Sequence, residues 1–402
     1  MDKNKWIENI KKRTKGVPIS SGRSEKLGKI SFDDLVFVPA QLAKRPVDYF
    51  KEEISSKTVI GKNSKKPIEI EVPILFGAMS FGALSKEAKM ALAKASTLAG
   101  TIANTGEGGV LSEERELAKY LTIQYSTGRF GISEEILKKA DVIEVKIGQG
   151  AKPGQGGLLP AHKLTEEIAK VRQVPMDKDV HSPAYHRDIK TIDDLKAKIN
   201  WLREIAGGVP IVLKLGAPGR EEDIRLAVQA DPDIIAIDGM EGGTGAAPEI
   251  MLNDIGVPTL AVLSMTRRIL DEMGARQELW VAGGLNKGAD FAKALALGAD
   301  AVFCATPLLI AMGCIYCRLC WQGKCPKGIA TQDKELRTLD VDQAAQNVAD
   351  YIKNSTEEIK MVAGACGEDD VHKLQKHHLR ALTQEVSLIA KVKLISQQIY
   401  GN

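Results

Sequence analysis

The chain has 402 residues, of which 44% are hydrophobic and 27% charged, and its 55 basic and 52 acidic residues leave a formal net charge of +3. This near balance argues against a nucleic-acid-binding protein, which would carry a strong basic excess. No run approaches the roughly 18 apolar residues of a membrane span, and the polar N-terminus lacks the apolar core of a signal peptide. We therefore expect a cytoplasmic protein with no nucleic-acid or membrane partner.

The chain divides into four predicted segments. Residues 1–70 are basic and rich in Pro, Gly and Ser, and we interpret them as an N-terminal extension wrapped on a larger body. Residues 71–312 form that body, residues 313–332 a cysteine-rich loop, and residues 333–402 a C-terminal helical segment. Amphipathic patterns in this last segment predict helices at Val341–Val362 and at about His378–Ile395, which we expect to brace the body or to form a subunit contact.

Short apolar runs alternate with helical stretches from about residue 72 onward. Most of the runs are almost entirely apolar, which is typical of strands buried on both faces of a parallel sheet. Eight such βα units in about 240 residues predict an α/β fold of the (β/α)8 TIM barrel type. The alternative, an open doubly wound sheet, would more naturally show a Gly-x-Gly-x-x-Gly turn after its first strand. The predicted strands are Ile74–Met79, Thr101–Asn104, Val142–Ile147, Ile211–Leu215, Ile234–Ile237, Thr259–Leu263, Leu279–Ala282 and Ala301–Cys304.

Four of the six cysteines stand close together in the predicted loop after the eighth strand, and Pro326 follows the last of them. Disulfides are rare in a reducing compartment, so this clustering favours a metal site. Thiolates at this spacing suit an iron–sulfur cluster, and a four-cysteine zinc site is the alternative. Cys304 and Cys366 are expected to be inert buried thiols. The four clustered residues are Cys314, Cys317, Cys320 and Cys325.

Lysines lie in the predicted strands or directly after them. The active site of a barrel enzyme lies at the C-terminal ends of its strands, and burying an ammonium there is costly unless it meets a negative charge. Lys146, Lys152 and Lys214 therefore either pair with carboxylates such as Glu144 and Asp238 or face an anionic cofactor or a carboxylate substrate.

Glycines cluster after two of the predicted strands, and a threonine follows a third. Gly242-Gly243-Thr244-Gly245 follows the fifth strand, Gly283-Gly284 ends the seventh, and Thr306 follows the eighth. Glycine lets the backbone approach a phosphate closely, and barrels often bind phosphate after strands 7 and 8. The pattern predicts a phosphorylated cofactor, and the missing dinucleotide fingerprint favours FMN over FAD.

Seven motifs together are specific enough to indicate a family. They are Phe32-Asp33-Asp34-Leu35 through Pro39-Ala40-Gln41-Leu42, Gly77-Ala78-Met79-Ser80, Asn104-Thr105-Gly106-Glu107-Gly108-Gly109, Gly128-Arg129-Phe130-Gly131, Gln149-Gly150-Ala151-Lys152-Pro153-Gly154, Gly242-Gly243-Thr244-Gly245-Ala246, and Cys325-Pro326-x-Gly328-Ile329-Ala330-Thr331-Gln332. Through them, residues 30 to 380 resemble the FMN-binding synthase domain of glutamate synthase, especially its stand-alone form without a glutaminase domain.

The resemblance implies a barrel with FMN and a [3Fe–4S] cluster that forms L-glutamate from 2-oxoglutarate and ammonia by reducing 2-iminoglutarate. Electrons would come from ferredoxin or a reductase subunit. The family's glutaminase uses a cysteine at the extreme N-terminus, and no cysteine precedes Cys304 here, so a separate glutaminase subunit and a homo- or hetero-oligomer are expected. Two alternatives stay open: an N-methylglutamate synthase-type subunit that uses methylamine, and a non-catalytic flavin/iron–sulfur electron-transfer subunit.

The resemblance also implies roles for individual residues. Lys214 falls near flavin N1, and Glu107 falls where ammonia reaches the site. Gln149, Lys152 and Arg172 fall where the family holds the carboxylates of 2-oxoglutarate, with Lys146 beside them. The expected FMN-binding residues, besides Lys214, are Met79, Ser80, Thr105, Gln124, Gly243, Thr244, Gly245, Gly283, Gly284 and Thr306. The expected cluster ligands are Cys314, Cys320 and Cys325.

Two departures from the family pattern bear on the cofactors. Cys317 is an extra cysteine, so [4Fe–4S] remains an alternative to [3Fe–4S]. Ala282 stands before Gly283 where the family usually has an acidic residue, which affects how the ribityl chain would be held.

Overall fold

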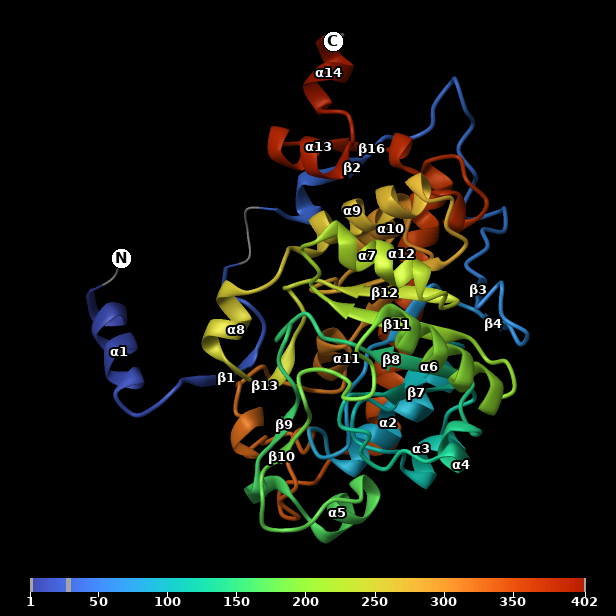
Figure 1. Cartoon of the computed structure of the whole chain (residues 1–402). Coiled ribbons are helices and arrows are strands. Elements are labelled where there is room, and N and C mark those ends of the chain that lie inside the picture. The colour runs from blue at the N-terminus through green and yellow to red at the C-terminus, as the bar shows by residue number, and fades with distance from the viewer. Residues whose placement is uncertain (1–2, 27–29, 401–402) are drawn as a thin grey trace.

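A closed barrel of eight parallel strands forms the centre of the molecule in this computed structural model, which describes residues 3–26 and 30–400 (Figure 1). Seven of the eight pairs of neighbouring strands are hydrogen-bonded in parallel register. A 3.2 Å hydrogen bond from Phe76 N to Ile102 O joins the first and second strands and closes the ring. The barrel strands are β5 (Ile74–Phe76), β6 (Ala103–Asn104), β7 (Leu121–Tyr125), β8 (Val142–Lys146), β11 (Ile211–Gly216), β12 (Ile234–Asp238), β14 (Glu278–Ala282) and β15 (Ala301–Cys304).

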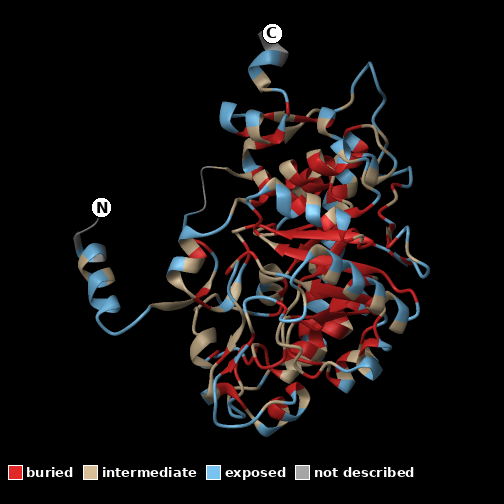
Figure 2. Ribbon diagram, in the orientation of Figure 1, coloured by how far each residue is buried: buried red, intermediate tan, exposed pale blue. Residues whose placement is uncertain are grey.

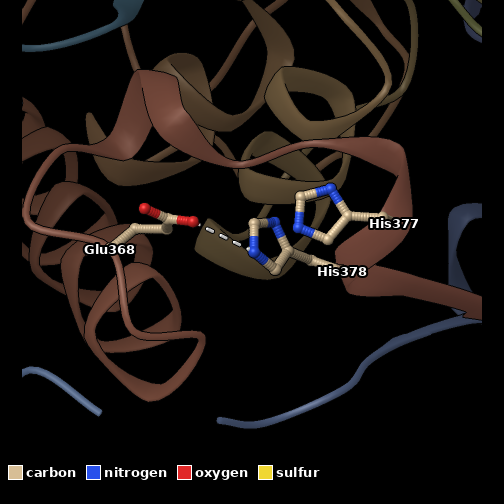
Figure 3. Close-up of side chains that lie close together, drawn as sticks. All are labelled: Glu368, His377 and His378. Carbon is tan, nitrogen blue, oxygen red and sulfur yellow. Dashed lines mark ion pairs between the residues drawn. The ribbon is translucent and has the colours of Figure 1, made fainter. Parts of the chain in front are cut away.

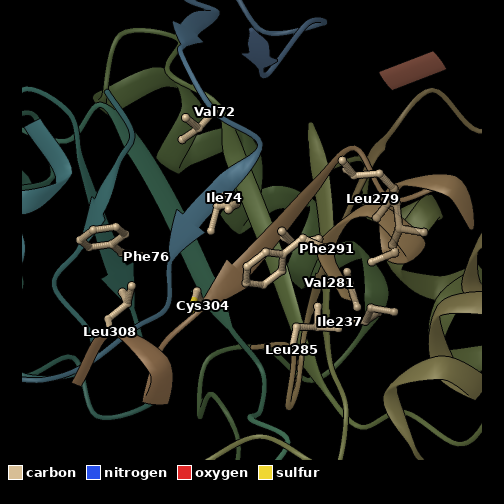
Figure 4. Packing of buried hydrophobic residues seen from close by; sticks show 14 of the residues in the cluster. Val72, Ile74, Phe76, Ile237, Leu279, Val281, Leu285, Phe291, Cys304 and Leu308 are labelled. Atoms are coloured by element: carbon tan, nitrogen blue, oxygen red, sulfur yellow. The ribbon is translucent and has the colours of Figure 1, made fainter. Parts of the chain in front are cut away.

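The strands are buried on both faces, as their apolar sequences predict (Figure 2). Alternate side chains, such as Leu75 and Trp280, fill the barrel interior, and the side chains between them pack outward against the helices (Figure 4). Burial of each large apolar side chain contributes about 1.5 to 3 kcal/mol. The hairpin of β3 (Thr58–Ile60) and β4 (Ile68–Ile70) adds its isoleucines to the interior cluster. It thereby closes the end of the barrel opposite the C-terminal strand ends.

Helices surround the barrel. The longest, α12 (Val341–Ala365), packs against α2 and α10 and extends three residues beyond its predicted end. A side-chain cap begins some of these helices, and in α2 the Ser85 side chain accepts a hydrogen bond from Ala88 N,. The others are α2 (Lys86–Leu98), α3 (Ser112–Leu117), α4 (Glu134–Leu137), α6 (Ile192–Ile205), α7 (Glu221–Gln229), α9 (Thr259–Glu272), α10 (Gly288–Ala296) and α11 (Thr306–Ala311).

The predicted number of barrel strands is correct only because one false strand replaces one missed strand. The predicted strand Thr259–Leu263 is the beginning of helix α9, whose buried positions recur at helical spacing through Leu270. The strand that takes its place in the count, β7, was not predicted because Thr122 and Gln124 interrupt its apolar character. Both polar side chains are buried. The predicted third, fourth and fifth strands are therefore the fourth, fifth and sixth of the barrel.

The N-terminal and C-terminal segments pair with distant parts of the chain. Helix α1 (Lys3–Arg13) stands apart from the barrel, and β1 (Ile19–Gly22) pairs with β13 (Thr244–Pro248). Strand β2 (Leu35–Phe37) pairs with β16 (Leu379–Ala381). The predicted helix His378–Ile395 is therefore wrong, because its first residues form a strand with a partner more than 300 positions away. Its helical part is α13 (Gln384–Ala390), followed by α14 (Ile395–Tyr400).

A long excursion leaves the barrel between β8 and α6. It contains β9 (Leu158–Leu159), which pairs with β10 (Val180–His181), and the helix α5 (Glu166–Arg172). No helix among residues 3–26 and 30–400 is long and apolar enough to cross a membrane. The remaining elements are α8 (Glu249–Asp254) and the 3-10 turns η1 (Phe32–Asp34), η2 (Ala161–Lys163), η3 (Cys320–Gln322), η4 (Val371–Lys373) and η5 (Lys376–His378).

Candidate functional site

A cavity of about 730 Å³ opens at the C-terminal ends of the barrel strands. The excursion, β13, the cysteine loop and the N-terminal strand β1 complete its walls. Most of the residues predicted to bind substrate or cofactor line it. The predicted residues in its lining are Met79, Ser80, Glu107, Gln124, Lys146, Gln149, Lys152, Arg172, Lys214, Gly243, Thr244, Gly245, Gly283, Gly284, Thr306, Cys314 and Cys320.

Three predicted residues are not part of this lining. Thr105 is buried behind it, where its hydroxyl accepts a 3.1 Å hydrogen bond from Gln124 N. Cys325 is buried and Cys317 is half-buried in the loop at the cavity's end.

Two of the three strand-end lysines have carboxylate partners. Lys146 Nζ lies 2.6 Å from Glu107 Oε2 and donates a 2.9 Å hydrogen bond to Gln149 Oε1. Burial by itself would raise the pKa of Glu107. The charge and hydrogen bond of Lys146, together with a hydrogen bond from Ser182 and the charge of Lys152, outweigh burial and hold that pKa below its usual value. Lys214 Nζ lies 3.3 Å from Asp238 Oδ2. Burial by itself would lower the pKa of Lys214, but Asp238 and the charge of Glu144 together raise it. The ion-pair interpretation therefore holds for both.

Two further cations in the cavity have no such partner. Lys152 is buried, and its ammonium donates a 3.3 Å hydrogen bond to Ala246 O. The Arg172 guanidinium is buried and donates to Phe81 O at 2.6 Å and to Ser80 Oγ at 3.3 Å. Neither has a carboxylate within 4.0 Å among the residues that the structure describes. Burial lowers the pKa of Lys152 to about 8 and that of Arg172 to about 10. Buried cations of this kind favour an anionic ligand.

Several residues of the site were not predicted. Phe130 lines the cavity, and the Arg172 guanidinium lies 5.6 Å from its ring centre. The Gly128-Arg129-Phe130-Gly131 motif was a usable signal for it. Lys163 and Tyr351 also line the cavity, and nothing in their sequence surroundings marks them.

The glycine loops form a part of the cavity wall, and at Gly243 and Gly283 there is no room for a Cβ atom. A Cβ on Gly243 would lie 2.6 Å from Thr306 Oγ1. Gly283 has a φ of +120°, and a Cβ there would lie 2.2 Å from Thr259 Oγ1. The Ser21 hydroxyl donates to Gly245 O at 2.7 Å, which ties β1 to this wall. Such an exposed backbone fits a phosphorylated cofactor such as FMN.

The cysteine loop reaches the far end of the cavity. Cys314 Sγ accepts a 3.4 Å hydrogen bond from Tyr316 N. Burial, followed by the negative charges of neighbouring thiols, raises the pKa of Cys314 and Cys320. No three cysteine sulfurs of the described chain lie within 4.8 Å of one another. A single zinc ion with bonds of about 2.3 Å would need them closer, whereas a cluster spreads its ligands over several irons. The thiols therefore fit an iron–sulfur cluster better than a zinc ion.

A second group of ligand-type side chains lies outside the cavity lining (Figure 3). It consists of Glu368, His377 and His378, with His378 Nε2 lying 3.1 Å from Glu368 Oε1. Lys44 Nζ lies 2.6 Å from the same oxygen, and His378 Nδ1 accepts a 3.0 Å hydrogen bond from Gln375 N. The ring proton of a neutral His378 is then on Nε2, which cannot ligate a metal in that state. This group is a structural contact between chain segments.

The sequence profile of a family described as "Conserved region in glutamate synthase" matches residues 4–369. A glutamate synthase large subunit-like protein of Rhizobium meliloti is 40% identical over 390 residues, which cover 92% of this chain and 88% of the relative. An archaeal glutamate synthase [NADPH] of Archaeoglobus fulgidus is 38% identical over 397 residues, or 92% of this chain and 78% of the relative.

Solved structures with the same fold are more distant in sequence. A flavocytochrome b2 variant with bound sulfite has a TM-score of 0.58 at 17% identity, covering 95% of this chain and 86% of that one. A mandelate oxidase variant with a monooxide FMN adduct has a TM-score of 0.53 at 17% identity, covering 87% and 88%. At these identities the likeness establishes the barrel fold alone.

Proposed function

The chain belongs to the glutamate synthase family, and we propose that it is an oxidoreductase forming L-glutamate from 2-oxoglutarate and ammonia by reduction of 2-iminoglutarate. FMN and an iron–sulfur cluster are its proposed cofactors. The observation that carries this proposal is the pair of buried cations without carboxylate partners, Lys152 and Arg172, in the cavity that also presents the glycine loops.

The substrate matches these cations in charge. 2-Oxoglutarate has two carboxylates, and Arg172 can offer one of them a bidentate, charge-assisted contact while Lys152 offers the other a single ammonium. Such contacts would hold the imine carbon in a fixed place for reduction. Glu107, kept ionised by Lys146, provides a negative site that can attract an ammonium ion into the cavity. Gln149 would orient Lys146 through its 2.9 Å hydrogen bond.

The FMN-binding residues are proposed from their place in the cavity wall. Gly243, Thr244 and Gly245 would hold the phosphate with Gly283, Gly284 and Thr306, and Met79, Ser80 and Gln124 would contact the flavin ring. Hydride donation to the imine carbon is the chemistry that FMN would supply when bound. Lys214 would stabilise negative charge on the reduced ring from its position at the end of β11,. The FMN adduct named for the mandelate oxidase variant supports a flavin on this fold.

Residues 313–332 are proposed to hold a [3Fe–4S] cluster through Cys314, Cys320 and Cys325, with Cys317 free. Cys317→Ser should then leave the iron content and the anaerobic absorbance spectrum unchanged. Loss of iron would make Cys317 a ligand and favour [4Fe–4S]. Zinc in place of iron in anaerobically purified protein would reject both forms.

Ammonia is a better nitrogen donor for this chain than glutamine. Glutaminase chemistry of the family's kind needs an activated thiol, and the two cysteines outside the loop are not activated. Burial raises the pKa of Cys304 to about 12 and that of Cys366 to about 11. Glutamine would need a separate glutaminase, and the electrons would come from ferredoxin or a reductase subunit.

The deciding experiment compares ammonium, methylamine and glutamine with 2-oxoglutarate and either reduced ferredoxin or dithionite, in protein purified without oxygen. Glutamate is expected with ammonium, together with about one FMN released per denatured chain. N-methylglutamate from methylamine, with little glutamate, would establish the alternative donor. No product from any amine, in protein with full flavin and iron, would reject a catalytic role and favour an electron-transfer subunit.

A further inference from the structure

Lys163 is a buried cation that the proposed reaction does not use. It ends the turn η2 in the excursion, is 6% exposed and lines the cavity. Its ammonium donates a 3.1 Å hydrogen bond to the backbone carbonyl of Cys320. Within the described ranges it has no carboxylate within 4.0 Å. An ammonium in this setting is costly unless a negative charge compensates it.

The lysine is held against the cysteine loop along its whole side chain. A Cβ on Gly323 would lie 3.5 Å from Lys163 Cγ and 3.8 Å from its Cε, so the stem runs along this glycine. Gly323 has a φ of +71°, and Thr331 Oγ1 donates a 2.5 Å hydrogen bond to its carbonyl. The charge of Lys163 interacts favourably with Cys320 and Cys325 and unfavourably with Arg172. The ammonium is therefore fixed beside the backbone of one proposed cluster ligand, Cys320, and within electrostatic range of a second, Cys325.

We propose that Lys163 supplies the positive charge that compensates the iron–sulfur cluster and thereby raises the cluster's reduction potential. A cluster held by thiolates is anionic, and a one-electron reduction adds a negative charge without making or breaking a bond in the protein. A fixed cation in a low-dielectric interior stabilises the reduced form more than the oxidised form. The electron comes from the external reductant of the proposed function, and this inference depends on the cluster proposed there.

The test compares three variants with the wild-type holoprotein. Lys163→Gln removes the charge but keeps a donor for the Cys320 carbonyl, and Lys163→Arg keeps both. Lys324→Gln is the matched control, since Lys324 is exposed and stands next to Cys325 in the same loop. Anaerobic redox titration should show at least a tenfold shift toward the oxidised cluster in Lys163→Gln, which is about 59 mV for one electron. Lys163→Arg should stay near wild type, and Lys324→Gln should change the equilibrium less than about twofold because water screens its charge.

Each other outcome has a definite meaning. Equal shifts in Lys163→Gln and Lys324→Gln, or no shift in either, would overturn the proposal. So would an unchanged potential with a raised KM for 2-oxoglutarate, which would make Lys163 a substrate contact. Failure of Lys163→Gln to take up iron, with full uptake by Lys163→Arg, would support a need for the charge. Failure of both would show that the loop needs the side chain's shape and would overturn the proposal. Wild-type protein that takes up no iron would instead reject the cluster itself.

Discussion

On one side of the cavity the lysines of β8 and β11 each have a carboxylate within 4.0 Å. On the other side the cations of the excursion have none within that distance among the described residues, and the charge of Glu107 acts on Lys152 and Arg172 only from farther away. Lys146 and Lys214 occupy paired positions on adjacent strands, and each has a carboxylate, Glu107 or Asp238, within 3.3 Å. Both charges are compensated within the protein.

The excursion places three buried cations against carbonyl or hydroxyl oxygens. They are Lys152, Lys163 and Arg172. A carbonyl satisfies a donor but does not neutralise its charge, so a nearby anion would stabilise each of the three, as we propose for the substrate and the cluster. The comparison teaches that burial alone does not make the cations of this cavity equivalent, because two of them meet a carboxylate within 4.0 Å and these three do not in the described structure.

The largest effect should follow removal of Arg172, a buried cation of the excursion that has no carboxylate within 4.0 Å in the described structure. Arg172→Ala should weaken apparent 2-oxoglutarate binding by about 2 to 5 kcal/mol, roughly 30-fold or more, because a desolvated charge-assisted contact is lost. Steady-state kinetics and direct binding measure this. Lys170→Ala, at an exposed position on the same helix, is the control and should change little. Unchanged affinity in Arg172→Ala would mean that the guanidinium only braces Phe81 and Ser80.

The two sides should also differ in apo-protein stability. Lys214→Met leaves Asp238 buried without its partner and should lower the free energy of unfolding by about 3 kcal/mol. Lys152→Met removes a buried charge that has no carboxylate within 4.0 Å among the described residues, and should leave that free energy unchanged or raise it,. Urea unfolding of flavin-free protein compares the two directly. Equal losses of unfolding free energy in both variants would contradict the proposed difference between the two sides of the cavity.

Glu278, at the opposite end of the barrel, tests without any ligand whether a buried charge lowers the stability of the fold. Glu278 begins β14, accepts a 2.7 Å hydrogen bond from Lys62 N, and has its pKa raised to about 7 from 4.5 by burial. The unfolded chain releases this proton near pH 4.5 and the folded chain near pH 7. Glu278 therefore reduces stability progressively as pH rises through that window, and fully above it.

Glu278→Gln should remove this cost, because the amide oxygen can still accept from Lys62 N. The expected gain is about 1 to 3 kcal/mol at pH 8 and close to zero at pH 4.5, measured by urea unfolding at both values. Glu204→Gln on the exposed face of α6 provides the control. A gain of the same size at both pH values would show that the charge is not its cause.

The sequence alone predicted the barrel, because strands buried on both faces are apolar over their whole length. The strands that broke this rule show its limit. In β7, Gln124 is polar because it donates to Glu144 inside the barrel, at 2.6 Å. The run that begins α9 is apolar because it covers the sheet as a helix, and a five-residue window does not separate the two periods,. Strand β16 depends on β2, a partner that no local pattern reveals.

The sequence also indicated which side chains would gather at the strand ends, since the C-terminal ends of parallel strands meet at one end of a barrel. The sequence could not show which of the lysines would have a carboxylate close enough to neutralise its charge. Lys146 and Lys152 stand in one short segment and have similar neighbours along the chain, yet only the first meets a carboxylate within 4.0 Å in the described structure. Nothing in the sequence around Lys163 indicated that it would line the cavity. Ion pairing depends on distances between segments far apart in sequence, and these distances exist only once the excursion, the strands and the cysteine loop have packed together.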